Sequence, residues 1–194
     1  MASIGTFLVI TATAIVALLQ LRHMRSSNQI AAVTSMNETL QSEKFTAARR
    51  FVAEQLPKLI ADRAVRNKLG AEIFPSELEA ARDVGNFFDV MGAFVKLDII
   101  DRNLACDLWD GVVFRSWKNL EPVALIRRKV SYAGTWCDFE YLAVLCERSL
   151  STRQGDYYPR GVPRITIDAS SMKTLSAFEA DQAASERGSN AENV

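Results

Sequence analysis

The most apolar stretch of this chain runs from Ile4 to Leu21, IGTFLVITATAIVALLQL, and contains no charged residue. As a helix rising about 1.5 Å per residue it would be about 27 Å long, close to the roughly 30 Å hydrocarbon core of a bilayer. A helix that is apolar on all sides is typical of a membrane span and rare as a soluble core helix at a chain's end. The stretch therefore predicts one transmembrane helix over about residues 4–21.

The residues on either side of this stretch predict whether it is cleaved and which of its ends faces the cytoplasm. A cleaved signal peptide needs a positive segment before the apolar run and a small-residue cleavage site after it, whereas this chain has MAS and QLRHMR. Arg22, His23 and Arg25 form a positive membrane flank after the run, and positive residues stay on the cytoplasmic side. We expect an uncleaved, single-pass anchor in the cell (inner) membrane, with the N-terminus outside and the body cytoplasmic.

The same helix is expected to continue past the bilayer, because no glycine or proline occurs from Arg22 to Leu40. Ile30, Val33, Met36 and Leu40 recur there at helical spacing. These side chains would be costly to leave in water, so they should pack on the body or on a second copy of the chain. We therefore expect residues 1–40 to form an anchor and juxtamembrane helix whose stripe is a possible interaction surface.

The body, residues 41–153, reads as a series of helices. Ser42 and Asp101 occupy positions typical of N-caps, and Pro57 should kink or split the first body helix. The strongest helical pattern follows, in Val84, Phe87, Phe88, Met91, Phe94 and Val95. The sequence predicts a helical bundle.

Other boundaries in the body are expected from local signals. A helix after Asp101 should continue across Gly111, since one glycine costs only about 1 kcal/mol relative to alanine, and it should end near Pro122. Two pairs have the spacing of N-terminal caps, Ser76 with Glu79 and Thr135 with Asp138.

Residues 154–194 are expected to be a linker and a flexible tail, because GDYYPRGVPR is rich in proline and glycine and the rest is small and polar. No strand alternation of useful length occurs. The predicted fold class is all-α: one transmembrane helix continuing into a helical bundle, with a disordered C-terminal tail.

Three stretches together carry a family resemblance: SSNQIAAVTSMNETLQSEKFTAARRFV, VGNFFDVMGAFVKLDIIDRNLACDLW and the later FEYLA. In this order, between about Arg25 and Arg148, they resemble the bacterial domain-of-unknown-function family 4760. The resemblance implies a small membrane-anchored helical protein. It implies no activity that could be assigned to a residue.

Composition excludes some classes of function. The net charge is zero, with 23 basic and 23 acidic residues, so a nucleic-acid partner is not expected. The three cysteines, Cys106, Cys137 and Cys146, lack the C-x-x-C spacing of metal or redox sites, and we expect them to be buried and reduced.

No catalytic, cofactor or metal site is expected. The only histidine, His23, lies at the membrane flank, so the usual base of a hydrolase is missing from the body. No glycine-rich phosphate-binding motif occurs. The best metal candidate is acidic, but it lacks the alternation of a calcium loop and is better explained by caps and solvated faces: Asp98, Asp101, Asp107 and Asp110.

Basic residues in the body have two interpretations each. Arg127, Arg128 and Lys129 could touch anionic lipid or simply end a helix. Arg49 lies near an apolar stripe, so we expect it to be half-buried and paired with an acid such as Asp89 or Glu140.

Two hypotheses of function follow. The first is a membrane-tethered helical bundle that serves as a module for binding an unknown protein partner or for forming a homo-oligomer. The second is a membrane-associated enzyme or lipid-acting protein that uses Asp and Arg groups near Trp109 and Trp117. A packed Trp/Phe core favours the first, and a polar pocket at those groups favours the second.

Overall fold

The computed structural model describes the backbone of the chain apart from residues 1, 154–160, 164, 167 and 192–194. For residues 2–9, 11, 12, 21, 22, 25, 26, 153 and 185–191 the backbone is described but the side chain is not. The chain divides into two compact units, Met1–Gly155 and Asp156–Val194. The described part has helices and no strand, which confirms the all-α prediction.

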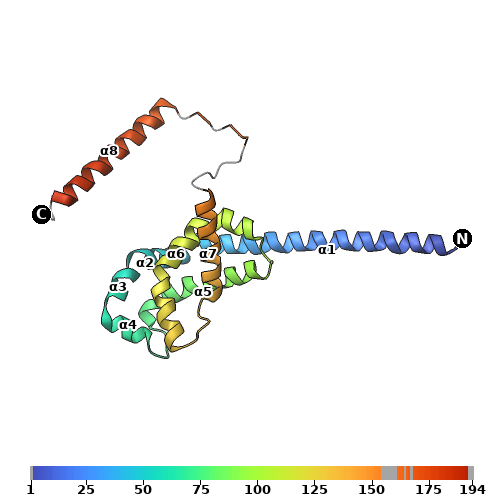
Figure 1. Ribbon diagram of the computed structural model, residues 1–194, viewed down its shortest axis with the longest axis horizontal. Coiled ribbons are helices and arrows are strands. Elements are labelled where there is room, and N and C mark those ends of the chain that lie inside the picture. The colour runs from blue at the N-terminus through green and yellow to red at the C-terminus, as the bar shows by residue number, and fades with distance from the viewer. Residues whose placement is uncertain (1, 154–160, 164, 167, 192–194) are drawn as a thin grey trace. The chain divides into compact units, whose positions relative to one another are not determined.

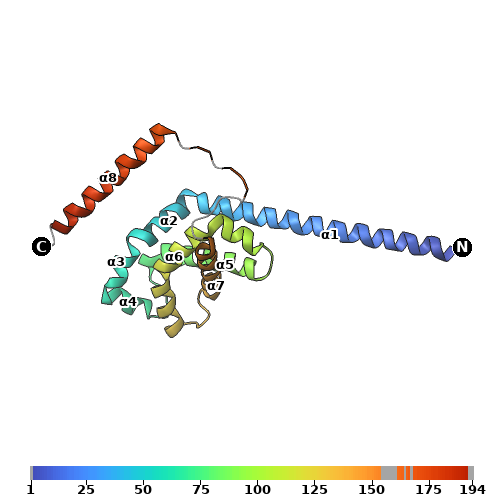
Figure 2. The same ribbon diagram turned by 45° about the horizontal axis from the view of Figure 1, so that its top comes forward.

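The first unit is built from helices in chain order (Figures 1 and 2). They are α1 (Ala2–Gln41), α2 (Glu43–Glu54), α3 (Leu56–Ala61), α4 (Arg63–Leu69), the short 3₁₀ helix η1 (Ser76–Leu78), α5 (Glu79–Lys96), α6 (Arg102–Val130) and α7 (Cys137–Arg153). Helix α7 packs against both α5 and α6, and α2 packs on α5.

Several predicted boundaries are confirmed. Ser42 precedes α2 and accepts a hydrogen bond from the Phe45 N–H at 3.3 Å. Asp101 precedes α6 and accepts from the N–H groups of Asn103 and Leu104 at 2.9 and 3.0 Å. The chain breaks between α2 and α3 just before Pro57, and α6 crosses Gly111.

Two predicted boundaries are wrong. Ser76 does not begin a capping box, because it lies inside η1, and neither η1 nor α5 starts with a side-chain cap. Helix α6 does not end at Pro122. That proline removes one N–H donor, but its ring is exposed, while Leu120 and Val123 on either side are completely buried. We infer that the burial of this apolar face outweighs the lost backbone bond.

The core lies between α5, α6 and α7 and is rich in aromatic rings. Phe88 and Phe139 are fully buried and stack with ring centroids 5.0 Å apart. Trp117 meets Phe139 edge to face, also at 5.0 Å, a geometry that aromatic pairs favour. Phe45 of α2 joins this cluster through Phe87, at 4.6 Å.

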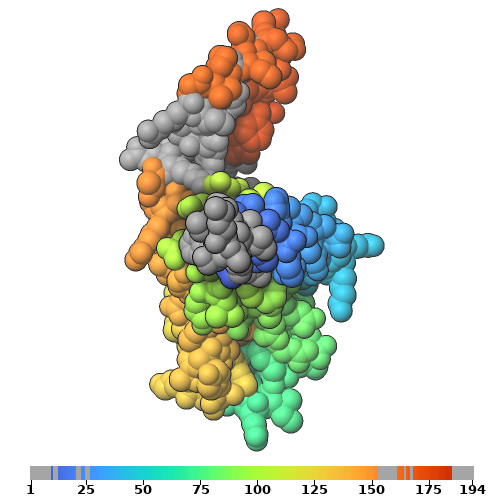
Figure 3. All heavy atoms as spheres, turned by 90° about the vertical axis from the view of Figure 1, so that its right-hand side faces the viewer, coloured from blue at the N-terminus to red at the C-terminus, as the bar shows by residue number. Residues whose placement is uncertain are grey.

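Helix α1 is continuous from Ala2 to Gln41, as predicted. Figure 3 views the molecule from the side of its N-terminus, with the described residues of α1 in blue and cyan. Among the described side chains, no helix combines the length and the apolar character that crossing a bilayer requires. The predicted span includes residues 4–9, 11, 12 and 21, whose side chains lie outside the described set, and the structure does not confirm it.

The second unit contains α8, Ala169–Ala191, where a disordered tail was predicted. Asp168 caps the N-terminus of this helix, since its Oδ1 accepts hydrogen bonds from the Ser171 N–H and the Ser170 hydroxyl at 2.8 and 2.7 Å. These bonds, the one from the Ser171 N–H first, lower the pKa of Asp168. An effective cap and frequent alanines explain the helix, although its described side chains are exposed.

Candidate functional site

The stripe predicted on the juxtamembrane part of α1 is divided between the body and solvent. Met36 and Leu40 are 7% and 6% exposed and belong to the hydrophobic core. Val33 is half-buried against that core, whereas Ile30 is 64% exposed. His23 is also exposed, and the side chains of its neighbours at positions 22 and 25 lie outside the described set. The stripe thus docks the end of α1 on the body and leaves Ile30 uncovered.

The corner between α1 and α2 fixes this docking. The Ser42 hydroxyl donates to the Thr39 carbonyl at 2.8 Å while it also accepts from the Phe45 N–H. One side chain therefore serves both helix ends, with Leu40 and Phe45 buried on either side of it.

The rings of Trp109 and Trp117 are packed in the core. The indoles are 4% and 6% exposed and lie in the core cluster. No group of three or more potential metal ligands occurs among the residues that were described. The packing of the rings matches the Trp/Phe core expected for the first hypothesis, whereas Arg115, close to Trp117 on α6, lines a polar pocket of the kind expected for the second.

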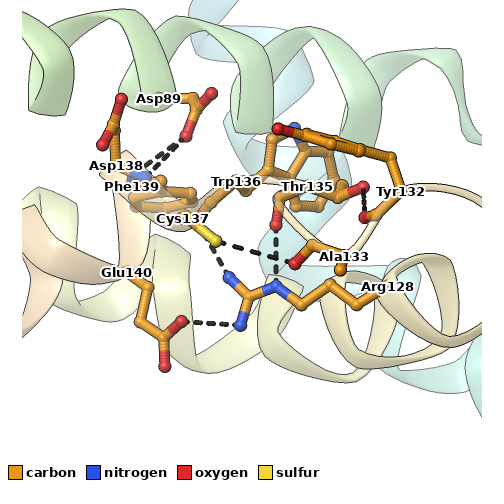
Figure 4. A network of polar contacts seen from close by, with 10 residues as sticks. All are labelled: Asp89, Arg128, Tyr132, Ala133, Thr135, Trp136, Cys137, Asp138, Phe139 and Glu140. Atoms are coloured by element: carbon orange, nitrogen blue, oxygen red, sulfur yellow. Dashed lines mark hydrogen bonds and ion pairs between the residues drawn. The ribbon is translucent and has the colours of Figure 1, made fainter.

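Helix α7 begins at a junction with α5 (Figure 4). Asp89 Oδ1 of α5 accepts hydrogen bonds from the N–H groups of Asp138 and Phe139, both at 3.0 Å. The predicted Thr135–Asp138 cap is therefore wrong: the Thr135 hydroxyl donates to the Tyr132 carbonyl, and the cap of α7 comes from another helix.

The residue before α7, Trp136, explains why an external cap is needed. Its side chain cannot accept a hydrogen bond, and its backbone has a φ of 54°, which is strained for a bulky residue. The indole is buried against Gly85, and its Nε1–H donates to Asn86 Oδ1 at 2.9 Å. Packing and this hydrogen bond hold the strained turn in place.

The same junction contains a close backbone contact and an ion pair. Gly92 lies so near the Asp138 carbonyl that an added methyl group would overlap it. The Lys96 ammonium pairs with the Asp138 carboxylate, and this hydrogen bond raises the pKa of Lys96. Positions 85, 89, 92 and 96 share one face of α5. The glycines and charges of VGNFFDVMGAFVK thus have a structural explanation.

Two of the three residues in the basic run at the end of α6 point inward. Arg127 is 8% exposed and donates to the carbonyls of Leu69, Ala71 and Glu72 at 3.1, 2.5 and 3.2 Å. Arg128 is half-buried. It donates to the Thr135 carbonyl at 2.8 Å and pairs with Glu140 at 2.6 Å. Only Lys129 of the three is exposed, so the lipid-contact interpretation of the run is wrong for both arginines.

The cysteines differ from the prediction at one position. Cys106 and Cys146 are buried, with their Sγ atoms 4.0 Å apart. The contact with Cys106 and burial raise the pKa of Cys146 well above its ordinary value. Cys137, at the start of α7, is exposed.

Arg49 is half-buried as predicted, but neither expected partner pairs with it. Asp89 caps α7, and Glu140 pairs with Arg128. Instead, Arg49 lines a pocket of about 250 Å³ whose other lining residues are Ala53, Val112, Arg115, Ser116 and Asn119. Sequence reasoning missed this pocket. The helical spacing of its four α6 residues was visible, but their pairing with α2 was not.

Comparison with known proteins relates this chain to one family. None of the curated proteins matches the chain, and none of the solved structures does. The sequence pattern of the domain of unknown function DUF4760 matches residues 7–145, most of the chain. This range contains α2–α6, the α5–α7 junction and the Arg49 pocket. The chain therefore belongs to the DUF4760 family, as its resemblance predicted.

Proposed function

We propose that this protein is a single-pass membrane protein whose helical body is held at the cytoplasmic face and which self-associates through α1. The observation that carries the proposal is the contrast along one continuous helix. Met36 and Leu40 at its C-terminal end are buried in the body, whereas Ile10, Leu18 and Met24 are 62%, 66% and 61% exposed.

The exposed apolar residues of α1 point to more than one side of the helix. Residues 10, 15, 16, 18 and 19 are all more than half exposed, and at about 100° per residue they are spread over about 240° of the circumference. A single partner helix would cover one side only. Lipid covers every side, which supports a bilayer as the surroundings of this segment.

The direction of insertion rests on the arginines at positions 22 and 25, which follow the apolar stretch. Because positive residues are retained on the cytoplasmic side, the body belongs in the cytoplasm. The exposed thiol of Cys137 provides a native reporter for this orientation, since Cys106 and Cys146 are buried.

A thiol-labelling experiment tests the topology. Intact cells are treated with a membrane-impermeant maleimide, and the same treatment is repeated after the membranes are opened. We expect labelling of Cys137 only in the opened sample, with a Cys137→Ser variant as the unlabelled control. Labelling in intact cells would place the body outside, and recovery of the protein in the soluble fraction would reject the anchor.

Self-association is supported by Ile30, which remains 64% exposed between the apolar stretch and the docked end of α1. In a Cys137→Ser background, we expect Ile30→Cys to form disulfide-linked dimers in oxidised membranes. Asn28→Cys, also exposed but about 160° away around the helix, is the matched control and should remain monomeric. Equal cross-linking of both variants would indicate random collision and would contradict self-association through Ile30. Cross-linking of Ile30→Cys to a different protein would show that this surface binds a partner protein instead of a second copy.

A further inference from the structure

We propose that the pocket between α2 and α6 binds the phosphate group of a ligand through Arg49 and Arg115. It is lined by two arginines, by the polar residues Ser116 and Asn119, and by the apolar residues Ala53 and Val112. No carboxylate lines it. A compact pocket with two positive charges and further hydrogen-bond donors is suited to an anion.

The state of Arg49 carries the inference. Its Nε is buried and, within the described part of the chain, has no hydrogen-bond partner. A buried charged donor without an acceptor is unfavourable, and native structures usually provide one. The two acids expected from the sequence to pair with it are engaged elsewhere, Asp89 at the start of α7 and Glu140 with Arg128. An oxyanion in the pocket would supply the missing acceptor.

Arg115 is positioned to act with Arg49. Its Nε donates to the Gly111 carbonyl at 2.9 Å, one turn back along α6. This bond fixes the side chain along the helix and leaves its terminal nitrogens for another acceptor. Val112, Arg115, Ser116 and Asn119 share one face of α6, while Arg49 and Ala53 share one face of α2.

The geometry favours phosphate over carboxylate. Donors approach from two helices, and a tetrahedral oxyanion offers acceptors in several directions, whereas the two oxygens of a carboxylate lie in one plane. The pocket, about 250 Å³, is smaller than the typical site for a drug-sized ligand and fits a phosphate group with a small attached part.

A second pocket with two arginines is a weaker candidate. Arg102 and Arg148 line a space of about 410 Å³ between the start of α6 and the end of α7. Both of these arginines are exposed, so water can satisfy them. The pocket at Arg49 is distinguished by its buried Nε donor.

The experiment uses the full chain in neutral-detergent micelles, labelled with ¹⁵N. The Arg49 Nε–Hε resonance, assigned by its loss in Arg49→Gln, is followed while inorganic phosphate is added at constant ionic strength. We expect a saturable shift of this resonance. Calorimetry should give at least about tenfold weaker binding for Arg49→Gln and for Arg115→Gln. Arg50→Gln removes an exposed arginine adjacent in sequence and should leave the affinity unchanged.

The outcomes separate the alternatives. Because Arg115 is exposed, its variant tests the site even if Arg49→Gln unfolds. An equal response to acetate would overturn the assignment to phosphate, and equal weakening by Arg50→Gln would overturn the site. Bicelles containing phosphatidic acid form a second arm. A shift there without one from inorganic phosphate would identify a lipid headgroup as the source, and no shift in either arm would reject the proposal.

Discussion

The carboxylate of Asp89 on α5 accepts a hydrogen bond from the backbone N–H of Phe139 at 3.0 Å, so the first turn of α7 is capped by a different helix. The same oxygen accepts from the Asp138 N–H. This single side chain satisfies two backbone donors that the strained Trp136 turn leaves without a local acceptor, and it joins α7 to α5 at the edge of the aromatic core.

Replacing Asp89 with alanine should therefore destabilise the body. Loss of an N-cap costs about 0.5–2 kcal/mol, and leaving two partly buried N–H groups unpaired places the effect at the upper end of that range or above it. Thermal unfolding followed by tryptophan fluorescence measures it. Asp83→Ala, an exposed position on the same helix, is the control and should change the stability by less than about 0.5 kcal/mol. Equal effects of the two variants would contradict the role assigned to Asp89.

This cap marks the limit of what the sequence could predict. Ser42 and Asp101 were correctly predicted because their acceptors lie two or three residues from the donors. Asp89 is about fifty residues from the helix it caps, and Arg127 is still farther from the carbonyls it binds. Local spacing contains no information about such partners.

Burial explains the other differences between the sequence-based predictions and the structure. The exposed proline of α6 is tolerated because Leu120 and Val123 are held in the core, a fact that no local rule includes. The half-burial of Arg49 was predicted from the apolar stripe beside it, but the α6 residues that line the pocket with it were not. The pocket exists because α2 and α6 pack together, and that pairing was not visible in the sequence.

Two glycines in long helices should respond to alanine with opposite signs. At Gly92 the added methyl group would overlap the Asp138 backbone, so the start of α7 must shift, at a cost of about 1–3 kcal/mol. At Gly111 it would meet only an Arg115 terminal nitrogen at 3.6 Å, an ordinary contact. Gly111→Ala should therefore stabilise α6 by up to about 1 kcal/mol. Chemical denaturation of both variants tests this pair, and destabilisation by Gly111→Ala or tolerance of Gly92→Ala would be inconsistent with the packing described.

Arg127 should be more important for folding than its neighbour Lys129. Its guanidinium donates to three carbonyls at and just after the end of α4, one in a buried and two in part-buried contacts, and Arg127→Met would remove the donor from all three, at about 1–3 kcal/mol. Lys129→Met removes the same charge from an exposed position and should have little effect on the melting temperature. Similar melting temperatures for the two variants would show that the carbonyl contacts contribute no stability.

The Lys96–Asp138 pair makes stability depend on pH in the alkaline range. Its hydrogen bond raises the pKa of Lys96 above the ordinary 10.5, so the folded protein holds this proton more tightly than the unfolded chain. The contribution is therefore complete below pH 10.5 and is lost as the pH rises through the raised pKa. Melting temperatures of the wild type and of Lys96→Met should differ at pH 8 and converge at higher pH, with a small difference because the ammonium is solvent-exposed. A constant difference between pH 8 and pH 11.5 would mean that the lysine stabilises the junction by packing of its aliphatic chain rather than by its charge.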